Sequence, residues 1–575
     1  MSDDSGTSVP APAGALRAWL AGRVAETSGV EPEEIDTGTP FDVYGVNSTD
    51  AVSLSGELAD RFGLQLAPTA LYDHPTIDAL VAHLVPAAPA PAAAAGPLAA
   101  APAADDDDPV CVVGMACRFP GGANSPELFW ELLSQGYDAS ADVPADRWDA
   151  YARYAEDPDA PGSAYTTRGA FVDDLAGFDP AFFGISPREA LRMDPQQRML
   201  LEVAWQALQD AGCAPDRLRG STTGVFVGMM PGSQYASLQR ERGGPEVLDD
   251  PYLGLGTASS VVAGRLSYLL DLRGPALLLD TACSSSLVAL HLAARSVRTG
   301  ESELALVGGV SAILHPDTYR QGSKMRMLAR DGRCKTFDAA ADGFLMGEGC
   351  GVVVLERLSD ATARGHRVLA VIKGSAVNQD GTSNGLTAPN GTAQRAVIRA
   401  ALADAGLTPD DVDFVEAHGS GTLLGDSIEM TGLHEVFGPG REEDRPLVVG
   451  AVKTNVGHLT GAAGMAGLIK TVLALEHGRI PRNLHHSEPS PAIDWDGCPT
   501  LLPDRLTDWP RRSGPRIAGV SSFGWSGTNS HVVLAQAPRP ERAPVPAGSR
   551  VLPLSGRTPE AVRTMAGELA ERLSA

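Results

Sequence analysis

Apolar positions return at helical spacing in three stretches of the first 85 residues. The stretches predict amphipathic helices over 15–30, 50–64 and 76–85. We expect the third helix to begin at Thr76, directly after Pro75, because threonine is a favoured N-cap. A small all-α domain, of the four-helix-bundle kind, is therefore expected over residues 15–85.

A different pattern follows, in which short apolar runs bounded by glycine alternate with helical stretches from residue 109 to 537. This alternation is typical of an α/β fold. It predicts strands over 110–116, 224–230, 275–280, 304–310, 350–356, 413–417 and 446–452. We interpret 275–280 as a buried strand because four successive apolar residues follow Gly274-Pro275.

The two patterns are separated by an alanine- and proline-rich run that ends in four aspartates. Residues 86–108 therefore predict an extended, acidic tether rather than a membrane span, since alanine and proline replace the leucine and valine of such spans. The segment 538–575 starts with prolines and ends in a helix without a cap. We interpret it as the start of a linker, truncated from a longer polypeptide.

The net charge of −25 argues against nucleic acid or an anionic membrane as partners, because both repel an acidic chain. Eleven acidic residues against three arginines make the small domain especially acidic. The seven cysteines have no CxxC pair, which indicates neither a disulfide framework nor a metal site and fits a cytoplasmic protein. The polar start "MSDDSGTSVP" is unlike a signal peptide.

One cysteine lies where a predicted strand turns into a predicted helix. Cys283 follows the strand 275–280, and apolar residues at helical spacing follow it up to Gly300. The N-terminus of a helix favours a thiolate and lowers the pKa of a cysteine there. Two interpretations stay open at this point, a reactive nucleophile and a small buried apolar residue, which is the common role of a free cysteine.

Two further segments place reactive side chains after a strand. "VDFVEAHGSGT" places His418 in a glycine-rich turn, and "LVVGAVKTNVGHL" places Lys453 and His458 before a helix over 462–477. In α/β sheets, ligands bind at the carboxyl ends of strands, so these groups and Cys283 could form an acyl-transfer centre. Ordinary loop histidines are the alternative. The glycine-rich loop 521–531 could bring backbone N–H groups to an oxyanion.

Taken together, "DTACSSSL", "VEAHGSGT", "KTNVGHL" and "SSFGWSGTNSH" resemble the β-ketoacyl synthases of modular polyketide synthases of antibiotic biosynthesis. Matches over 112–122, 178–212 and 332–344 extend the resemblance to nearly all of 109–537. It implies a thiolase-like fold of two similar halves, although the sequence shows no obvious repeat. It also implies a homodimer and an enzyme that performs decarboxylative Claisen condensation.

The resemblance implies a role for each candidate residue. Cys283 would take an acyl chain from a carrier thioester, and His418 and His458 would stabilise the enolate formed from a malonyl-type extender. Lys453 would hold the histidine network in position. The backbone N–H groups of Cys283 and Phe523 would form the oxyanion hole.

The small domain resembles an acyl carrier protein through "FDVYGVNSTDAVSL" and "LYDHPTIDAL". The resemblance implies that Ser48 carries 4'-phosphopantetheine, added by a phosphopantetheinyl transferase, although Ser48 could equally be an N-cap. The chain has Asn47-Ser48-Thr49 where carriers usually have Asp-Ser-Leu. Loss of the carboxylate and of the apolar side chain is expected to weaken recognition by the transferase.

Three alternatives to chain extension remain. A non-elongating ketosynthase would transfer the chain without condensing it, although such variants often lack the histidine found here as His418. A degradative thiolase would need a second cysteine in 521–531, where none occurs. The chain could also act mainly as a carrier and docking module. The expected partners are a downstream acyltransferase and acyl carrier protein of the same assembly line.

Overall fold

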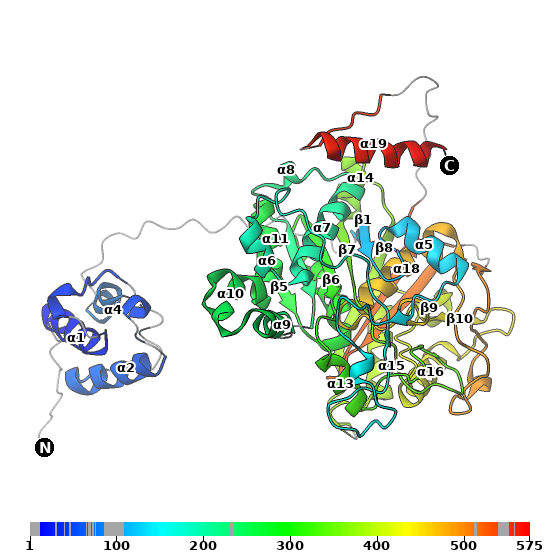
Figure 1. Cartoon of the computed structure of the whole chain (residues 1–575), viewed down its shortest axis with the longest axis horizontal. Helices are drawn as coiled ribbons and strands as arrows, with labels where there is room; N and C mark the ends of the chain where they lie inside the picture. Colours follow the sequence, from blue (N-terminus) through cyan, green and yellow to red (C-terminus); the bar gives the residue numbers. More distant parts are fainter. Residues whose placement is uncertain are drawn as a thin grey trace, which may run out of the picture. The chain divides into compact units, whose positions relative to one another are not determined.

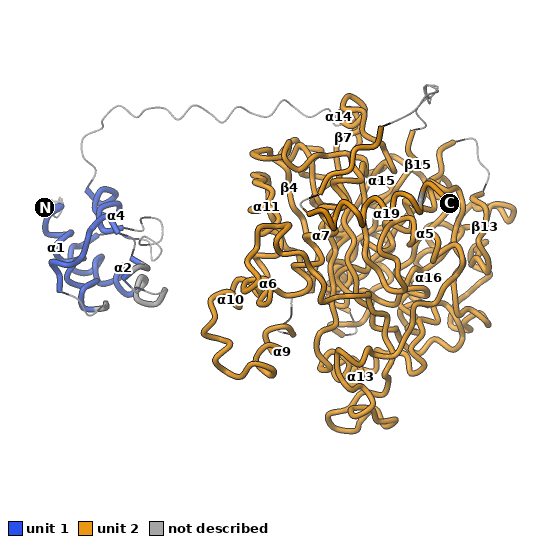
Figure 2. Tube along the Cα trace, turned by 45° about the horizontal axis from the view of Figure 1, so that its top comes forward, with its two compact units in different colours: residues 1–100 blue, residues 101–575 orange. Residues whose placement is uncertain are grey.

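The structure is a computed structural model, and the chain divides into two compact units, Met1–Ala100 and Ala101–Ala575 (Figure 2). It describes residues 12–28, 31–39, 41–44, 46, 48–64, 66, 71, 74, 76–85, 108–230, 232, 234–383, 385–510, 514–538, 551–556 and 558–574. Most of the predicted tether 86–108, all but Asp108, lies outside these residues. No helix among the described residues is long and apolar enough to cross a bilayer.

The described part of the small unit contains the α-helices α1 (Ala13–Ser28), α2 (Ser48–Phe62) and α4 (Ile77–Leu84) and the short 3-10 helices η1 (Pro32–Glu34) and η2 (Phe41–Tyr44). The three predicted helices are therefore present. Their apolar faces meet in one core, to which Leu20, Leu58 and Leu80 contribute fully buried side chains. Thr76 caps α4 as predicted, because its hydroxyl accepts a hydrogen bond from the Ala79 N–H at 3.1 Å.

The large unit is built on one eleven-stranded sheet in the order β12-β10-β9-β14-β15-β8-β1-β7-β6-β4-β5 (Figure 1). All seven predicted strands are in it. Its strands are β1 (Val110–Arg118), β4 (Gly224–Gly228), β5 (Ala276–Leu279), β6 (Leu304–Ser311), β7 (Gly349–Arg357), β8 (Ala370–Gln379), β9 (Phe414–Glu416), β10 (Leu447–Gly450), β12 (Thr500–Leu501), β14 (Ile517–Phe523) and β15 (Thr528–Gln536).

Apart from the edge strand β12, the sheet consists of two halves with the same topology. The first half runs β5-β4-β6-β7-β1 and the second β10-β9-β14-β15-β8, so each half, numbered in its own chain order, reads 3-2-4-5-1. The parallel and antiparallel pairings also correspond strand by strand, and the halves join where β1 pairs antiparallel with β8. The duplication that the resemblance implied is thus visible in the strand order.

Helices cover both faces of each half. The central helices α12 (Ser285–Arg298) and α18 (Ala463–His477) share one hydrophobic cluster with residues of strands from both halves, such as Phe226 and Phe414. The neighbouring residues Val225 and Val415 point to the other face, in a second cluster with α7 (Pro195–Asp210) and α15 (Gly391–Ala405). This alternation in strands that are buried on both faces gives the layered, thiolase-like architecture.

The prediction that 275–280 is a buried strand was wrong. β5 is the last strand of the sheet and pairs only with β4, so Ala276 and Leu277 are exposed, Leu277 by 43%. A run of apolar residues cannot distinguish a strand covered by its own chain from an apolar edge strand. The helix predicted in the segment 538–575 is present as α19 (Pro559–Ser574).

Candidate active site

Cys283 lies in a tight turn between β5 and α12, as the sequence predicted. The turn is a short 3-10 helix, Ala282–Ser284, in which Ala282 has a φ of +58°. A left-handed alanine costs on the order of 1–2 kcal/mol, and the surrounding hydrogen bonds hold it. The Thr281 N–H donates to Ser285 Oγ at 2.9 Å, and Ser522 Oγ donates to the carbonyl of Cys283 at 2.8 Å.

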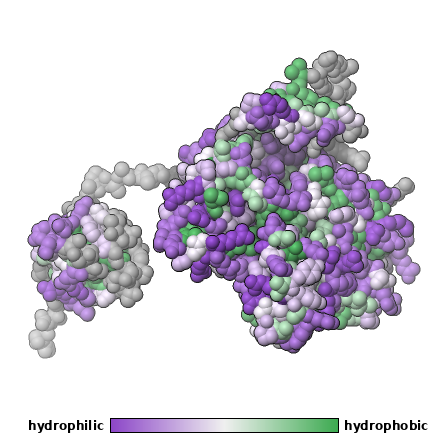
Figure 3. Space-filling view, in the orientation of Figure 1, coloured by the Kyte–Doolittle hydropathy of each residue, from purple (hydrophilic) through white to green (hydrophobic). Residues whose placement is uncertain are grey.

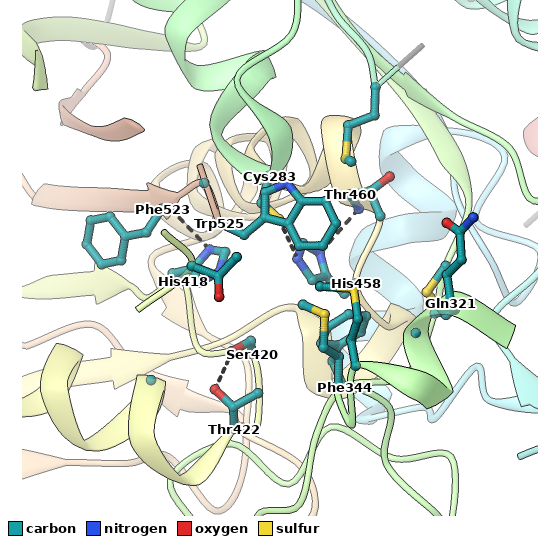
Figure 4. Close-up of a pocket in the computed structure, with 18 of the residues that line it drawn as sticks. Cys283, Gln321, Phe344, His418, Ser420, Thr422, His458, Thr460, Phe523 and Trp525 are labelled. Atoms are coloured by element: carbon teal, nitrogen blue, oxygen red, sulfur yellow. Dashed lines mark hydrogen bonds between the residues drawn. The ribbon is translucent and has the colours of Figure 1, made fainter. Parts of the chain in front are cut away.

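His458 is in direct contact with Cys283, at 3.1 Å from His458 Nε2 to Cys283 Sγ (Figure 4). It follows β10 and the short helix α17 (Lys453–Val456). The Thr460 N–H donates to Nδ1 of His458 at 3.2 Å. Because Nδ1 is an acceptor, a neutral His458 carries its proton on Nε2 and donates it toward the sulfur.

His418 follows β9 and reaches the same site from the other side. Its ring packs edge-on to His458, with centroids 5.6 Å apart. The Phe523 N–H donates to Nδ1 of His418 at 3.3 Å, so the proton of a neutral His418 also lies on Nε2 (Figure 4). Both imidazoles therefore have one nitrogen held by backbone and the other free to donate.

Phe523 was predicted to supply an oxyanion-hole donor, and in this structure its N–H is bonded to His418. A second backbone N–H, that of Trp525, is directed at Cys283 instead and favours the thiolate. Phe523 stays a predicted oxyanion donor. To act as one, its N–H must either bind His418 and the oxyanion at once or leave His418 for the oxyanion. Sequence reasoning did not single out Trp525, whose side chain also lines the cavity.

Burial governs the ionisation of the site. It lowers the pKa of His418 and of His458 well below the usual range, and the positive charge of Lys453 lowers both further. Both rings are therefore neutral donors at physiological pH. Burial also raises the pKa of Cys283, against the nearby charge of Lys453 and the N–H of Trp525. The expectation that the helix start lowers the pKa of Cys283 was wrong, since the desolvation of the buried thiol raises it.

Lys453 is buried close to the two histidines, and its ammonium donates to the backbone carbonyl of His418. Burial lowers the pKa of Lys453, and the carboxylates of Glu416 and Glu429 oppose this shift. Glu416 in turn forms a buried ion pair with Lys470 at 2.7 Å. Lys453 thus contacts the loop of His418, and its role in holding the histidine network stays a prediction.

Two buried carboxylates that sequence reasoning missed hold the loop of His418. Glu429, on α16 (Leu423–Phe437), accepts the N–H groups of His418 and Gly419 at 2.7 and 2.8 Å. Asp426, one helical turn earlier, accepts the N–H groups of Phe337 and Gly421 at 2.8 and 3.1 Å. The sequence contains a signal for them, because two acidic residues three positions apart lie in the helix that follows the glycine-rich turn.

Cys283, His418, His458 and Phe523 open into one cavity of about 630 Å³. The second half of the sheet contributes a polar wall that includes Ser420, Thr422, Gln394 and Asn529. The first half contributes a wall rich in methionine: Met230, Met325, Met327 and Met346. Among the residues that the structure describes, no group of His, Cys, Asp and Glu side chains could hold a metal ion.

Ser48 is the first residue of α2 in the small unit. Asn47 and the side chains of Ser48 and Thr49 lie outside the part of the chain that the structure describes. The chemistry of the position fits a phosphodiester, since the N-terminus of a helix favours an attached phosphate.

Models of known families match nearly the whole chain. The β-ketoacyl synthase N-terminal domain matches residues 107–361 and the C-terminal domain residues 369–487. A ketoacyl-synthetase C-terminal extension matches 489–575, and a phosphopantetheine attachment site matches 18–84.

Similar proteins include erythronolide synthase EryA2 of Saccharopolyspora erythraea, 50% identical over 562 residues, or 96% of this chain. The pikromycin polyketide synthase component PikAII of Streptomyces venezuelae is 50% identical over 546 residues, or 94% of it. The chain spans only 15% and 14% of these two relatives.

Solved ketosynthases have the same fold. The oxazolomycin ketosynthase domain OzmH KS7 of Streptomyces albus JA3453 is 41% identical with a TM-score of 0.76, covering 82% of this chain and 81% of that one. The ketosynthase from module 6 of the bacillaene synthase of Bacillus subtilis 168 is 34% identical, with a TM-score of 0.72, over 81% and 77% of the two chains. The predicted thiolase-like fold is confirmed.

Proposed function

The chain belongs to the β-ketoacyl synthase family, and on this premise we propose that it extends a polyketide chain by decarboxylative condensation. The observation that carries the proposal is the 3.1 Å contact of Cys283 Sγ with a donating His458 Nε2, in a cavity shared with His418. A nucleophile, two neutral donors and backbone N–H groups are the parts that acyl transfer and enolate formation require.

In the first step, Cys283 attacks the acyl thioester of a carrier. A bond forms from Sγ to the acyl carbon, the bond to the carrier sulfur breaks, and the thiol proton ends on that sulfur. The Nε2 proton of His458 stabilises the thiolate, which compensates for the raised pKa of Cys283. The N–H groups of Cys283 and Phe523 bind the tetrahedral oxyanion.

In the second step, a malonyl-type thioester enters the same cavity. Its carboxylate leaves as carbon dioxide, and the electron pair moves onto the thioester oxygen to form an enolate. The Nε2 protons of His418 and His458 bind that oxygen, since both Nδ1 atoms are occupied by backbone N–H groups. The enolate carbon then attacks the acyl group on Cys283, a carbon–carbon bond forms, and the cysteine thiolate is released. Lys453 keeps the loop of His418 in place.

The phosphopantetheine attachment domain supplies the carrier function, and we infer that Ser48 is the attached residue. When bound, the arm supplies a thiol that carries acyl groups as thioesters. A phosphopantetheinyl transferase is thus a required partner. The domain limits that we propose are 15–85 for the carrier, 86–108 for the tether, 109–537 for the ketosynthase and 538–575 for the start of a further linker.

We also propose that the large unit is a homodimer that pairs through β5. Most of the surface in Figure 3 is hydrophilic, with smaller hydrophobic patches between. The edge strand β5 exposes Leu277, and the helix packed beside it, α11 (Ser259–Leu270), exposes Tyr268 by 84%. An apolar edge strand is a site for pairing with a second chain. A downstream acyltransferase and acyl carrier protein and a cytoplasmic location, which suits seven free thiols, complete the proposal.

The proposed function is tested by intact-mass measurement after incubation with acyl and malonyl thioesters. The wild-type large unit should gain one acyl group and release carbon dioxide with the extender. The Cys283→Ala variant should gain none, and Cys213→Ala, at a buried cysteine outside the cavity lining, is the control. A covalent acyl group on the large unit of Cys283→Ala would contradict the assignment.

A further inference from the structure

The side chain of Gln234 is fixed in one orientation in the wall of the active-site cavity. It is the first residue of α9 (Gln234–Gly243) and is half-buried. Its Oε1 accepts two hydrogen bonds, from the Leu314 N–H at 3.0 Å and from the Thr318 hydroxyl at 3.2 Å. Two donors on one atom identify that atom as the amide oxygen, so the Nε2 group faces the opposite way.

The Nε2 group of Gln234 finds no acceptor among the described residues. The neighbouring Gly232 also lines the cavity, and a Cβ added there would lie 3.7 Å from Nε2. Gly232 thus has no side chain that would lie against the amide. Two N–H donors are therefore held in place in the wall of the cavity without a partner in the described part of the protein.

The surroundings make this donor distinctive. Nearby polar groups are either bonded within the protein or solvated: both ring nitrogens of His315 are engaged, by Glu241 and by the Asp317 N–H, and Gln321 is exposed. The rest of this wall is rich in apolar side chains, four methionines and Phe344, and its other polar members are Ser237, Thr318 and Asp317, which accepts a hydrogen bond from Arg320. Methionine adapts to irregular apolar shapes and sets little selectivity by itself. An oriented amide in such a wall is able to discriminate between chains.

We propose that Gln234 is a specificity-determining residue that binds an acceptor oxygen, a hydroxyl or a carbonyl, on the acyl chain attached to Cys283. This inference rests on the proposed function, because it assigns the methionine-rich wall to that acyl chain. The polar wall on the other side of Cys283 suits the amide-containing arm of a carrier, which leaves the apolar wall for the chain. An unfunctionalised chain would leave the Gln234 donors unpaired.

Substitutions of Gln234 can distinguish a hydroxyl from a carbonyl on the acyl chain. A hydroxyl both donates and accepts, whereas a ketone only accepts. Gln234→Glu keeps an oxygen for Leu314 and Thr318 but replaces the donors with an acceptor, so it can still bind a hydroxyl and cannot bind a ketone. Gln234→Met removes both possibilities. One hydrogen bond of this kind changes relative rates by about tenfold, which corresponds to about 1.4 kcal/mol.

The experiment measures the acylation rate of Cys283 by intact mass with pantetheine thioesters of equal chain length. The chains are saturated or carry one hydroxyl or one keto group, moved carbon by carbon along the chain. Wild type should prefer both oxygenated chains to the saturated chain by about tenfold at one position. Gln234→Met should abolish both preferences, and Gln234→Glu should abolish only the ketone preference, at a pH well above the usual carboxyl pKa of about 4.3.

Gln239→Met is the matched control, because Gln239 lies on the same helix, bonds to Arg192 and does not line the cavity. It should retain both preferences. Equal wild-type rates for the three chains at every position, or a preference that survives in Gln234→Met, would overturn the inference while leaving Cys283 acylation intact. If no chain acylates wild-type Cys283, the proposed function itself fails.

Discussion

Replacement of Glu429 by glutamine should impair decarboxylation much more than acylation of Cys283. The carboxylate accepts two N–H groups, from His418 and Gly419, and it is buried with only 3% of its surface exposed. An amide has a single acceptor oxygen, so one of these N–H groups would lose its partner and face an NH₂ group. The backbone of His418 would then be less firmly fixed, and its ring would be less well placed to bind the enolate oxygen.

The size of the effect follows from the bond that is lost. A hydrogen bond to a charged group contributes about 1.5–3 kcal/mol, and part of this is offset because the neutral amide is cheaper to bury. If the lost bond raises the activation free energy of enolate formation by about 2 kcal/mol, that step becomes about 30-fold slower. Acylation depends on Cys283 and His458, neither of which bonds to Glu429 in the structure, so it should change by less than about threefold.

The assay compares carbon dioxide release from a malonyl-carrier with acyl loading by intact mass. Glu435→Gln is the control, since Glu435 lies on the same helix, is exposed, and its carboxylate forms a surface ion pair with Arg395. It removes the same charge without touching the loop. Equal decarboxylation by Glu429→Gln and Glu435→Gln, with both proteins folded, would refute the positioning role.

The same carboxyl predicts a pH dependence. Burial raises the pKa of Glu429 from 4.5 to about 6, so it loses the form that accepts two N–H groups as the pH falls through 6. Decarboxylation should therefore decline below this pH in wild type. Glu429→Gln should lose the part of the decline that Glu429 causes and keep only the part due to Asp426, whose pKa burial raises to about 7. Stability has the opposite sign: a carboxyl with a raised pKa in the folded state binds its proton more tightly there, so its contribution to the free energy of unfolding falls as the pH rises through 6.

Three further predictions concern the other groups. His418→Ala should spare acyl loading and slow decarboxylation about 100-fold, the usual effect of one lost oxyanion donor, whereas His458→Ala should slow both, because it is His458 that contacts Cys283; similar profiles of the two variants would contradict this division. A transferase should modify Ser48 and not Ser48→Ala, and Asn47→Asp should be modified faster, with a gain that shrinks as salt screens the added charge; a mass shift in Ser48→Ala would refute the site. Leu277→Asp should convert the large unit from dimer to monomer in light scattering, because it places charge on the exposed edge of β5; an unchanged mass would contradict pairing through β5.

The sequence predicted seven of the eleven strands of the large sheet, the helices of the small unit and those that follow Cys283 and His458. It also predicted the convergence of Cys283, His418 and His458, because each follows a strand and strand ends share one edge of an α/β sheet. It did not predict what depends on tertiary contact. The exposure of β5 depends on whether a neighbour covers it, and the pKa of Cys283 depends on how much protein surrounds the sulfur. The Glu429 carboxylate accepts a backbone N–H and the Thr460 N–H donates to His458, and these hydrogen bonds exist only in the folded chain.

The duplicated topology explains why groups 175 residues apart meet. Cys283 and His458 come after the same strand of each half, the third, and precede the same helix, α12 or α18. These two helices pack together in the centre, and Gly464 permits their approach, since a Cβ there would lie 2.6 Å from Leu287 Cγ. Packing the paired helices therefore brings their N-terminal ends together. The two halves then diverge in chemistry: the first supplies the nucleophile and the apolar wall, and the second supplies both imidazoles. Neither half alone contains the site, so its formation requires the antiparallel junction of β1 with β8.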